Sequence, residues 1–352
     1  MKKLSQCQRL LFSSFIFSLA SFSQAKNNEN SEIEKTEVNG HRSNLIGEAV
    51  SASVGTVSFE DIAVRPLLRT GEILETVPGM VATQHSGSGK ANQYFLRGFN
   101  LDHGTDFATS VDSMPVNMRT HGHGQGYTDT NFLIPELLQE INYKKGPYYA
   151  DNGDFSGVGS ANIITQSHRH HNTLSLGVGE NGFLRGVLAG STALANGDLL
   201  YGLEAQRYDG PWEDIDEDVD KQNIWLKQSW GEANDRFSLM LMAYDNSWNS
   251  PDQIPARAVN SGQIDDLGSI DTTVGGESSR YSLSASWDKA VGTGQLKASV
   301  YAIDYSLNLI SNFTYFMDDP VNGDQFIQAD DRNIYGWDVA YTVNDNWAGL
   351  KV

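Results

Sequence analysis

The sequence IPELLQEINYKKGPYYADNGDFSGVGSANIIT, at residues 134–165, contains the pattern that decides the fold of the N-terminal half. Pro135 suits the first turn of a helix and Glu136 lies near that helix's positive end, so PELLQE predicts a short helix. Gly146 and Pro147 follow, and each sets the backbone: glycine permits unusual conformations and proline fixes φ. The stretch therefore predicts a compact globular unit that mixes helix and strand.

The residues before this stretch show the same mixture. Thr70 is a candidate cap for a helix that runs through Val77, and Pro78-Gly79 would end it. Strand-like runs broken by glycine and aspartate follow. They contain Tyr94, Leu96, Phe107 and Val111. We expect one α+β domain at residues 45–168.

From about residue 172 the pattern changes to strict alternation. One strand-like run sets apolar positions against small or polar ones, with Tyr281, Leu283, Ala285 and Trp287 on the apolar face. This period of two predicts β-strands with one apolar and one polar face. The change predicts that residues 169–352 form a separate, all-β region.

The connections between these runs alternate between short and long. Short turns fall at 195–198, 231–235, 290–294 and 343–346, and long loops fall at 209–221, 247–277 and 311–331. An antiparallel meander with tight turns on one rim and large loops on the other is typical of outer-membrane barrels. The alternative is a soluble sheet with buried aromatic residues, but such a sheet has no reason to sort its loops by rim.

The strand count predicts an incomplete barrel. About eight strands fit into residues 169–352, with the start of a ninth at Trp347. A barrel of eight strands is filled by its own side chains, whereas barrels with a plugged lumen have around 22 strands. The predicted fold is therefore an α+β domain followed by a truncated antiparallel transmembrane β-barrel, whose parent would have about 22 strands.

The N-terminus predicts export. Three basic residues, Lys2, Lys3 and Arg9, precede an apolar stretch at residues 10–20. A small-residue cleavage site follows at Ser23-Gln24-Ala25, so residues 1–25 are predicted to be a signal peptide. A membrane anchor is the alternative, but it needs ~20 apolar residues. The polar residues 26–44 predict a flexible segment. The formal net charge of −19 argues against a nucleic-acid partner.

Four segments in order resemble the plug domain of TonB-dependent receptors. They are LETVPGM (74–80), YFLRGFN (94–100), VDSMPVN (111–117) and the stretch at 134–165. Two departures are Ser113, where the family has a turn glycine, and Asp154-Phe155-Ser156, where small residues are commoner. The resemblance implies a plug followed by a transmembrane barrel in outer-membrane lipid. It also implies a receptor without enzymatic activity.

The resemblance further implies a coupling peptide and a plug latch. The best match to the coupling peptide is Glu34, Lys35, Thr36, Glu37 and Val38. As an extended strand, this peptide would add to the sheet edge of a TonB-type energy-transducing protein of the inner membrane. A leader without a partner is the alternative for these residues. Arg97 and Lys145 look like the family's buried plug cations, which pair with barrel carboxylates.

Histidines in two glycine-rich stretches suggest a metal-containing substrate. The candidate ligands are His103, His121, His123, Asp102 and Asp129, with Asp106 as an additional carboxylate. Imidazole nitrogen and carboxylate oxygen together suit zinc, nickel or copper, and we expect these loops to be exposed to the ligand. The alternative is that polar loop residues bond to one another. We expect no resident cofactor.

These features favour one function over several alternatives. The predicted function is TonB-dependent uptake of a scarce nutrient: a metal chelate, siderophore, haem or cobalamin. A passive porin-like channel or a surface-binding protein is the first alternative, and a soluble periplasmic binding protein is the second. A zinc hydrolase would need further ligands and a general base around an open site, which the sequence does not offer.

Overall fold

The computed structural model describes residues 48–351, except 50, 67–68, 86, 233, 313–315, 322, 344–345 and 348–349. All described residues fall in one compact unit that spans residues 42–352. The expected signal peptide (1–25) and the coupling residues Glu34–Val38 lie outside the described residues. Within the described part of the chain, no helix is long and apolar enough to cross a membrane.

The described residues up to Thr165, called the plug below, form two small sheets and three short helical turns. The larger sheet has the order β1-β2-β8-β9-β6-β7, and only β6 and β9 pair in parallel. The smaller sheet has the order β3-β4-β5. The strands are β1 (Glu48–Ala49), β2 (Val54–Ser58), β3 (Met80–Thr83), β4 (Gln93–Leu96), β5 (Phe99–Asn100), β6 (Phe107–Val111), β7 (Met114–Pro115), β8 (Leu138–Lys145) and β9 (Gly159–Thr165).

The helical turns correct two sequence predictions. The 3₁₀-helix η2 (Thr70–Thr76) lies where a helix is expected, but Arg69 is its cap residue and Thr70 binds the side chain of Asn131 instead. The 3₁₀-helix η3 (Pro135–Leu137) has a single turn, so the prediction that PELLQE is helical is wrong beyond Leu137. The reason is tertiary: residues from Leu138 onward join β8, which pairs with both β2 and β9. The third element, α2 (Phe59–Ala63), starts with a capping box made by Ser58 and Asp61.

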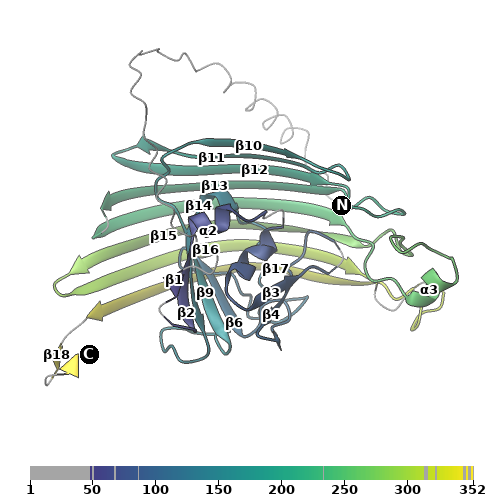
Figure 1. Ribbon diagram of the computed structural model, residues 1–352, viewed down its shortest axis with the longest axis horizontal. Helices are drawn as coiled ribbons and strands as arrows, with labels where there is room; N and C mark the ends of the chain where they lie inside the picture. The colour runs from purple at the N-terminus through teal and green to yellow at the C-terminus, as the bar shows by residue number, and fades with distance from the viewer. Residues whose placement is uncertain are drawn as a thin grey trace, which may run out of the picture. The chain divides into compact units, whose positions relative to one another are not determined.

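The second region is an eight-stranded antiparallel sheet, called the wall below, in which each strand pairs with the next along the chain. Figure 1 shows these strands as a stack of long arrows running side by side. The strands are β10 (Thr173–Val178), β11 (Leu184–Leu194), β12 (Gly197–Tyr208), β13 (Val219–Glu232), β14 (Asp235–Asn249), β15 (Gly275–Val291), β16 (Gly294–Ser311) and β17 (Phe326–Val343). The predicted antiparallel meander is confirmed.

The loops of the wall are sorted by rim as expected. Long connections at 209–218, 250–274 and 312–325 lie on the same rim as the short turn after β10, and the loop at 250–274 contains α3 (Ala256–Asn260). Among the described residues, the connections on the other rim are tight turns. A strand does begin near Trp347, as predicted, but it does not join the wall. This strand, β18 (Asn346–Trp347), pairs with β19 (Leu350–Lys351) in a sheet of its own.

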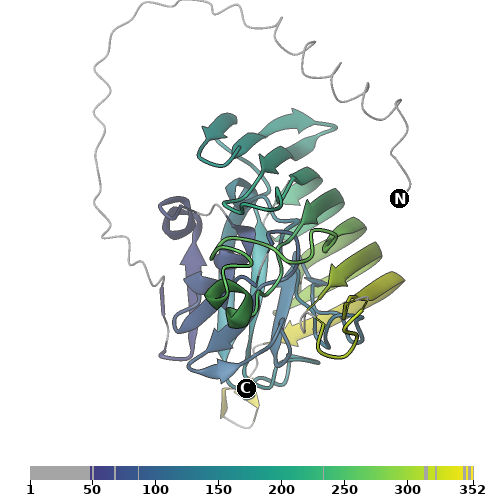
Figure 2. The same cartoon turned by 90° about the vertical axis from the view of Figure 1, so that its right-hand side faces the viewer.

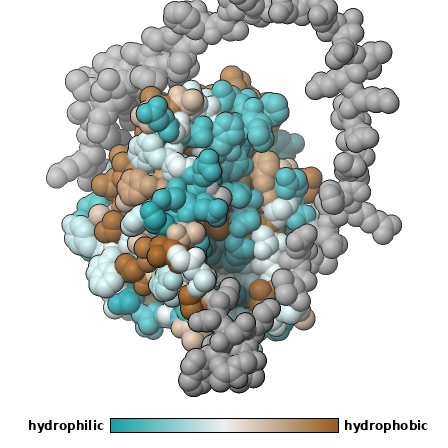
Figure 3. Space-filling model, turned by 90° about the vertical axis from the view of Figure 1, so that its left-hand side faces the viewer, coloured by the Kyte–Doolittle hydropathy of each residue, from teal (hydrophilic) through white to brown (hydrophobic). Residues whose placement is uncertain are grey.

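The two faces of the wall have opposite chemistry. On one face, large apolar side chains are open, with Leu283 50% and Trp337 76% exposed. On the other face, Tyr244 and Trp225 are buried against the plug. Figure 3 looks along the strands from the side of the tight turns, and hydrophilic residues fill much of the middle of that view. An apolar outer face and a polar-to-aromatic inner face are what a sheet in lipid with a filled interior requires.

The plug packs directly on the inner face of the wall. Figure 2 shows its sheet alongside the curved strands, and one continuous core of buried side chains contains residues of both regions. Phe132 of the plug stacks on Trp225 of β13 with ring centroids 6.5 Å apart. The guanidinium of Arg280, on β15, lies 4.7 Å from the Phe132 ring and donates to the carbonyl of Pro115. The contact is therefore both apolar and polar.

Candidate functional site

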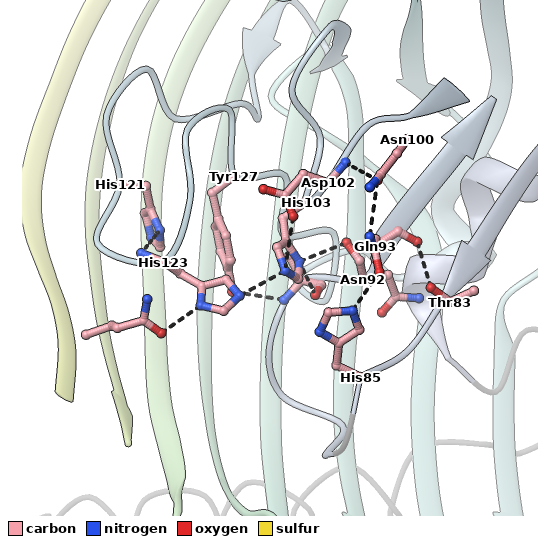
Figure 4. A network of polar contacts seen from close by, with 12 residues as sticks. Thr83, His85, Asn92, Gln93, Asn100, Asp102, His103, His121, His123 and Tyr127 are labelled. Carbon is pink, nitrogen blue, oxygen red and sulfur yellow. Dashed lines mark hydrogen bonds and ion pairs between the residues drawn. The ribbon is translucent and has the colours of Figure 1, made fainter. Parts of the chain in front are cut away.

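Four histidines of the plug lie close together, next to strands of the wall (Figure 4). His85 follows β3, His103 follows β5, and His121 and His123 lie in the loop between β7 and η3. The ring centroids of His103 and His123 are 4.3 Å apart, and those of His103 and His85 are 5.1 Å apart. The structure thus brings together His103, His121 and His123, as the sequence predicts, and adds His85, for which no local pattern gave a signal.

His103 is buried rather than exposed, which corrects the expectation for its loop. Its Nδ1 lies 3.0 Å from the carbonyl oxygen of Ala91 and 3.2 Å from that of Asn92. Carbonyl oxygens only accept hydrogen bonds, so Nδ1 must carry the proton. In the neutral ring, Nε2 therefore presents a lone pair.

His123 has the same tautomer for a different reason. Its Nδ1 lies 2.8 Å from Oε1 of Gln328 on β17, and Nε2 of Gln328 donates to the carbonyl of Gly122 at 3.0 Å. The second bond fixes the orientation of the amide, so Nδ1 of His123 is the donor. Nε2 of His123 is again unprotonated, and it lies 2.9 Å from Nε2 of His103.

His121 is held differently and does not join this pair. The main-chain N–H of His123 donates to Nδ1 of His121 at 3.1 Å, so the lone pair of His121 is already engaged. Its ring stacks on Tyr127 at a centroid distance of 3.9 Å, and its Nε2 lies 3.2 Å from the Tyr305 hydroxyl of β16. These contacts make His121 a link between the plug loop and the wall.

The fourth ring, His85, lies at the edge of the cluster. Its Nε2 is 2.7 Å from Oε1 of Gln93, whose Nε2 donates to Oδ1 of Asn100. Asn100 Oδ1 also accepts from the N–H of Asp102, which fixes both amides. Nε2 of His85 is therefore the donor, and its Nδ1 is free of a proton.

The two candidate carboxylates lie in different places. Oδ1 of Asp102 is 3.7 Å from Nε2 of His103, and its side chain is more than half exposed. Asp129 is buried and accepts the main-chain N–H of Asn131, and burial raises its pKa to about 6. No contact joins Asp129 to the histidines among the described residues, so its predicted role as a ligand stays a prediction.

Burial also favours the neutral form of His103, His121 and His123. The pKa of His103 is lowered to about 3. The main cause is its removal from water, and the electrostatic effects of the nearby His123 and His85 add to it. Desolvation likewise lowers the pKa of His123 and brings the pKa of His121 to about 4. In the part of the chain that the structure describes, no three His, Cys, Asp or Glu side chains already surround one point as a complete metal centre would require.

A cavity of about 930 Å³ lies next to the cluster, between the plug and the long-loop end of the wall. The plug contributes His85, Asn92 and Glu72 to its lining, and the wall contributes Tyr208, Trp212 and Lys221. The cavity reaches the edge of the cluster, because His85 lines it and so does Asn92, whose carbonyl oxygen contacts His103.

Two ion pairs between plug and wall have no counterpart among the sequence-based predictions. Arg185 of β11 binds Glu136 of the plug and Glu204 of β12, each at 2.6 Å. Lys227 of β13 lies 3.1 Å from Asp112 of the plug. In both cases the wall supplies the cation and the plug supplies a carboxylate. Alternating strands give no signal of which polar residue meets the plug.

The predicted latch residues have other partners. Arg97 donates to the carbonyl of Ala52, and Lys145 donates to the carbonyl of Pro78 at 3.2 Å. Lys145 also lies over the ring of Tyr143. Among the described residues, neither cation has a carboxylate partner from the wall, so the predicted pairing is not observed there and the latch role stays a prediction.

Comparison with known proteins shows which plug domain and which solved structures this geometry is similar to. The family model for the TonB-dependent receptor plug domain matches residues 47–160. The structure of the copper transporter OprC aligns with a TM-score of 0.62 at 17% identity, over 84% of this chain and 43% of that chain. The ferric citrate transporter FecA, in its unliganded form, aligns with a TM-score of 0.65 at 15% identity, over 83% and 44%.

A third structure, the siderophore receptor PiuA from Acinetobacter baumannii, aligns with a TM-score of 0.63 at 14% identity, over 85% of this chain and 43% of that chain. Identities this low establish similarity of fold alone. The chain spans less than half the length of these receptors. TonB-dependent receptors are transporters, not enzymes. Residues 47–160 match the family model of the TonB-dependent receptor plug domain, and the fold of the chain is similar to that of the solved receptors OprC, FecA and PiuA.

Proposed function

We propose that this chain is an outer-membrane receptor that imports a scarce, metal-containing nutrient, with energy supplied through a TonB-type protein of the inner membrane. The observation that carries the proposal is that the plug packs on the inner face of the wall. A ligand that entered from the long-loop side would meet the cavity and then the plug, and it would pass only if the plug moved.

The contacts of the plug explain why such movement needs work. The Lys227–Asp112 and Arg185–Glu136 pairs bridge plug and wall, and the side chains of Lys227 and Asp112 are almost fully buried. Separating a buried ion pair without new partners costs about 3–5 kcal/mol. Several such contacts favour a receptor that is driven by an external motor over one that opens spontaneously.

The substrate class is supported by the site and by the relatives. The cavity is lined by both polar and apolar side chains, and one of them is His85, an imidazole at the edge of the cluster. Imidazole nitrogens are donors that suit transition metals. Among receptors of the same fold, one is a copper transporter and another a ferric citrate transporter. A copper-like ion or a metal chelate is therefore the proposed cargo.

A passive porin-like channel or a surface-binding protein is the second candidate. The plug covers the inner face of the described strands, and this counts against free diffusion. A surface-binding protein would use the long loops without any movement of the plug. The two functions differ in whether the N-terminal coupling residues matter.

The decisive experiment replaces Glu34–Val38 by five Gly and Ser residues in the host strain. A matched replacement of residues 39–43 is the control. We expect the first variant to lose metal-limited growth and uptake while its outer-membrane level stays normal, and we expect the control to grow like the wild type. Normal uptake by the first variant would reject energy coupling and favour the passive alternative.

A further inference from the structure

The two imidazoles at the centre of the cluster face each other with their unprotonated nitrogens. Nδ1 of His103 donates to plug carbonyls, and Nδ1 of His123 donates to Gln328, so both Nε2 atoms carry lone pairs. These atoms are only 2.9 Å apart. At hydrogen-bond distance, two lone pairs without a proton between them repel each other, because neither atom donates.

A shared proton would relieve this repulsion only at a cost. It would turn one ring into an imidazolium within a cluster of rings that is largely withdrawn from water. A charged group in such a site is disfavoured unless it has a charged partner. The carboxylate of Asp102 lies 3.7 Å from His103, and its side chain is mostly in solvent. A multiply charged cation suits the two lone pairs better, since it interacts with both at once.

The surroundings of the pair are those of metal-binding histidines. Such histidines almost always donate their second ring N–H to a carbonyl, carboxylate or amide oxygen, which fixes the tautomer and raises the basicity of the ligating nitrogen. Ala91, Asn92 and Gln328 supply these oxygens here. His121, whose lone pair is already used by a main-chain N–H, lacks this arrangement.

The spacing indicates the geometry of the ion. Two nitrogens at about 2.0–2.1 Å from one metal are about 2.9 Å apart at a right angle and about 3.4 Å apart at the tetrahedral angle. The observed distance of 2.9 Å matches the right angle. The planes of the two rings are inclined by 60°, so they do not stack. Right angles between nitrogen ligands are typical of tetragonal Cu²⁺ or Ni²⁺ sites.

We propose that Nε2 of His103 and Nε2 of His123 bind a divalent transition-metal ion as cis ligands, with Cu²⁺ as the best-fitting occupant. Asp102 is the third ligand, because its Oδ1 lies 3.7 Å from Nε2 of His103, a separation that two donor atoms of one metal ion can have. Water from the adjacent cavity completes the coordination. Gln328 is a positioning residue, since it acts on the metal through His123.

The role of this ion as cargo rests on the proposed function, but the site itself does not. The experiment uses Cu²⁺ as the probe on the protein purified in detergent from its host. Electron paramagnetic resonance counts the coupled imidazole nitrogens, and competition with a chelator of known affinity gives the dissociation constant. His103→Gln and His123→Gln remove one ligand each. His168→Gln is the matched control, because His168 is an exposed histidine that pairs with Asp198.

We expect two coupled nitrogens in the wild type and one in each ligand variant, with affinity at least ten times weaker. Gln328→Leu leaves both ligands in place and provides a second test if the ligand variants fold poorly. It should weaken binding about 10-fold to 100-fold while two nitrogens remain. The His168→Gln variant should bind like the wild type.

The proposal is overturned if the wild type binds Cu²⁺ through fewer than two imidazoles, or if the signal follows His168 instead. It is also overturned if His103→Gln and His123→Gln bind as tightly as the wild type. Normal copper binding together with growth that does not depend on Glu34–Val38 would reject the proposed function alone. Loss of growth in that coupling variant, together with unchanged binding in the ligand variants, would reject the metal site alone.

Discussion

At Gly89 the backbone of the plug passes directly over the indole of Trp248 on β14. A Cβ atom at this position would lie 1.8–2.4 Å from ring atoms of Trp248, which is itself buried. No rotation of a flexible chain end relieves such an overlap, so either the loop or the indole must shift. Shape complementarity at one residue thus helps to set how the plug sits on the wall.

Gly89→Ala should therefore loosen the plug. Overpacking of a filled core costs about 1–3 kcal/mol, so the free energy of unfolding should fall by that amount. Gly153→Ala is the control, because a Cβ there meets nothing within 4 Å. Urea unfolding followed by tryptophan fluorescence measures both variants. An equal effect of the two substitutions would mean that the contact with Trp248 does not restrain the plug.

Asp129 shows a second effect of burial, on the pH dependence of stability. Its pKa is raised to about 6 by burial, against the lowering effects of Asn131, Arg280 and Lys221. Since the folded state holds the proton more tightly, this contribution to stability is complete below about pH 4 and is lost as the pH rises through about 6. Each unit of pKa corresponds to about 1.4 kcal/mol.

Asp129→Asn should remove that step. From pH 4 to pH 7, the free energy of unfolding of the variant should rise relative to that of the wild type, by on the order of 2–3 kcal/mol. Unfolding in urea at several pH values tests this directly. The exposed Asp266, changed to Asn, controls for the loss of one carboxylate. Parallel pH profiles of wild type and Asp129→Asn would contradict the prediction.

Residue-level features of the site were only partly predictable from the sequence. The glycine-rich stretches that contain His103 and His123 pointed to a metal, and the structure does place these two rings in contact. The burial of His103 could not be predicted, because it depends on carbonyls of Ala91 and Asn92 that no local pattern assigns to it. The tautomer of His123 depends on Gln328, which lies far along the chain.

At the scale of elements, β13 and the plug are joined through the turn between β6 and β7. The carboxylate of Asp112 in this turn accepts the N–H of Thr165 at the end of β9 and the ammonium of Lys227 on β13. Lys227 also donates to the hydroxyl and carbonyl of Thr165. One carboxylate therefore ties the turn, the end of a plug strand and a wall strand together.

A double-mutant cycle at this junction should show strong coupling. Lys227→Met leaves the buried carboxylate unpaired, and Asp112→Asn leaves the buried ammonium unpaired, so each should cost about 3–5 kcal/mol. The double variant should cost less than the sum, because it leaves neither charge alone. The free energy of unfolding in urea gives the three values. Simple additivity would show that the two groups do not interact in solution.

Elements were predictable where their pattern is local. The alternation of apolar and polar residues predicted the eight strands of the wall, and the turn composition predicted which rim carries the long loops. The extent of η3 was not predictable, since Leu138 and its successors are drawn into β8 by pairing with Thr165 and its neighbours. The pairing of β18 with β19 also escaped prediction.

At the scale of the whole molecule, the predictions rested on two kinds of signal. Motifs in the plug pointed to the TonB-dependent receptors, and loop sorting in the wall pointed independently to an outer-membrane sheet. The family model over residues 47–160 and the aligned structures agree with the first signal. The eight-stranded meander confirms the strands and the sorting of loops on which the second signal rested. The contacts between the regions, with cations from the wall and acids from the plug, required the structure.

The two imidazoles of the proposed ion site are oriented by different layers of the protein. His103 is fixed by carbonyls of the plug, whereas His123 is fixed by Gln328 of β17. A displacement of the plug that separated His123 from Gln328 would remove the hydrogen bond that orients this ring. The affinity for the ion and the position of the plug would then be thermodynamically linked. By reciprocity, a bound ion would stabilise the position of the plug against the wall. The two histidines would then bind the ion tightly while the plug is in place and release it when a force displaces the plug.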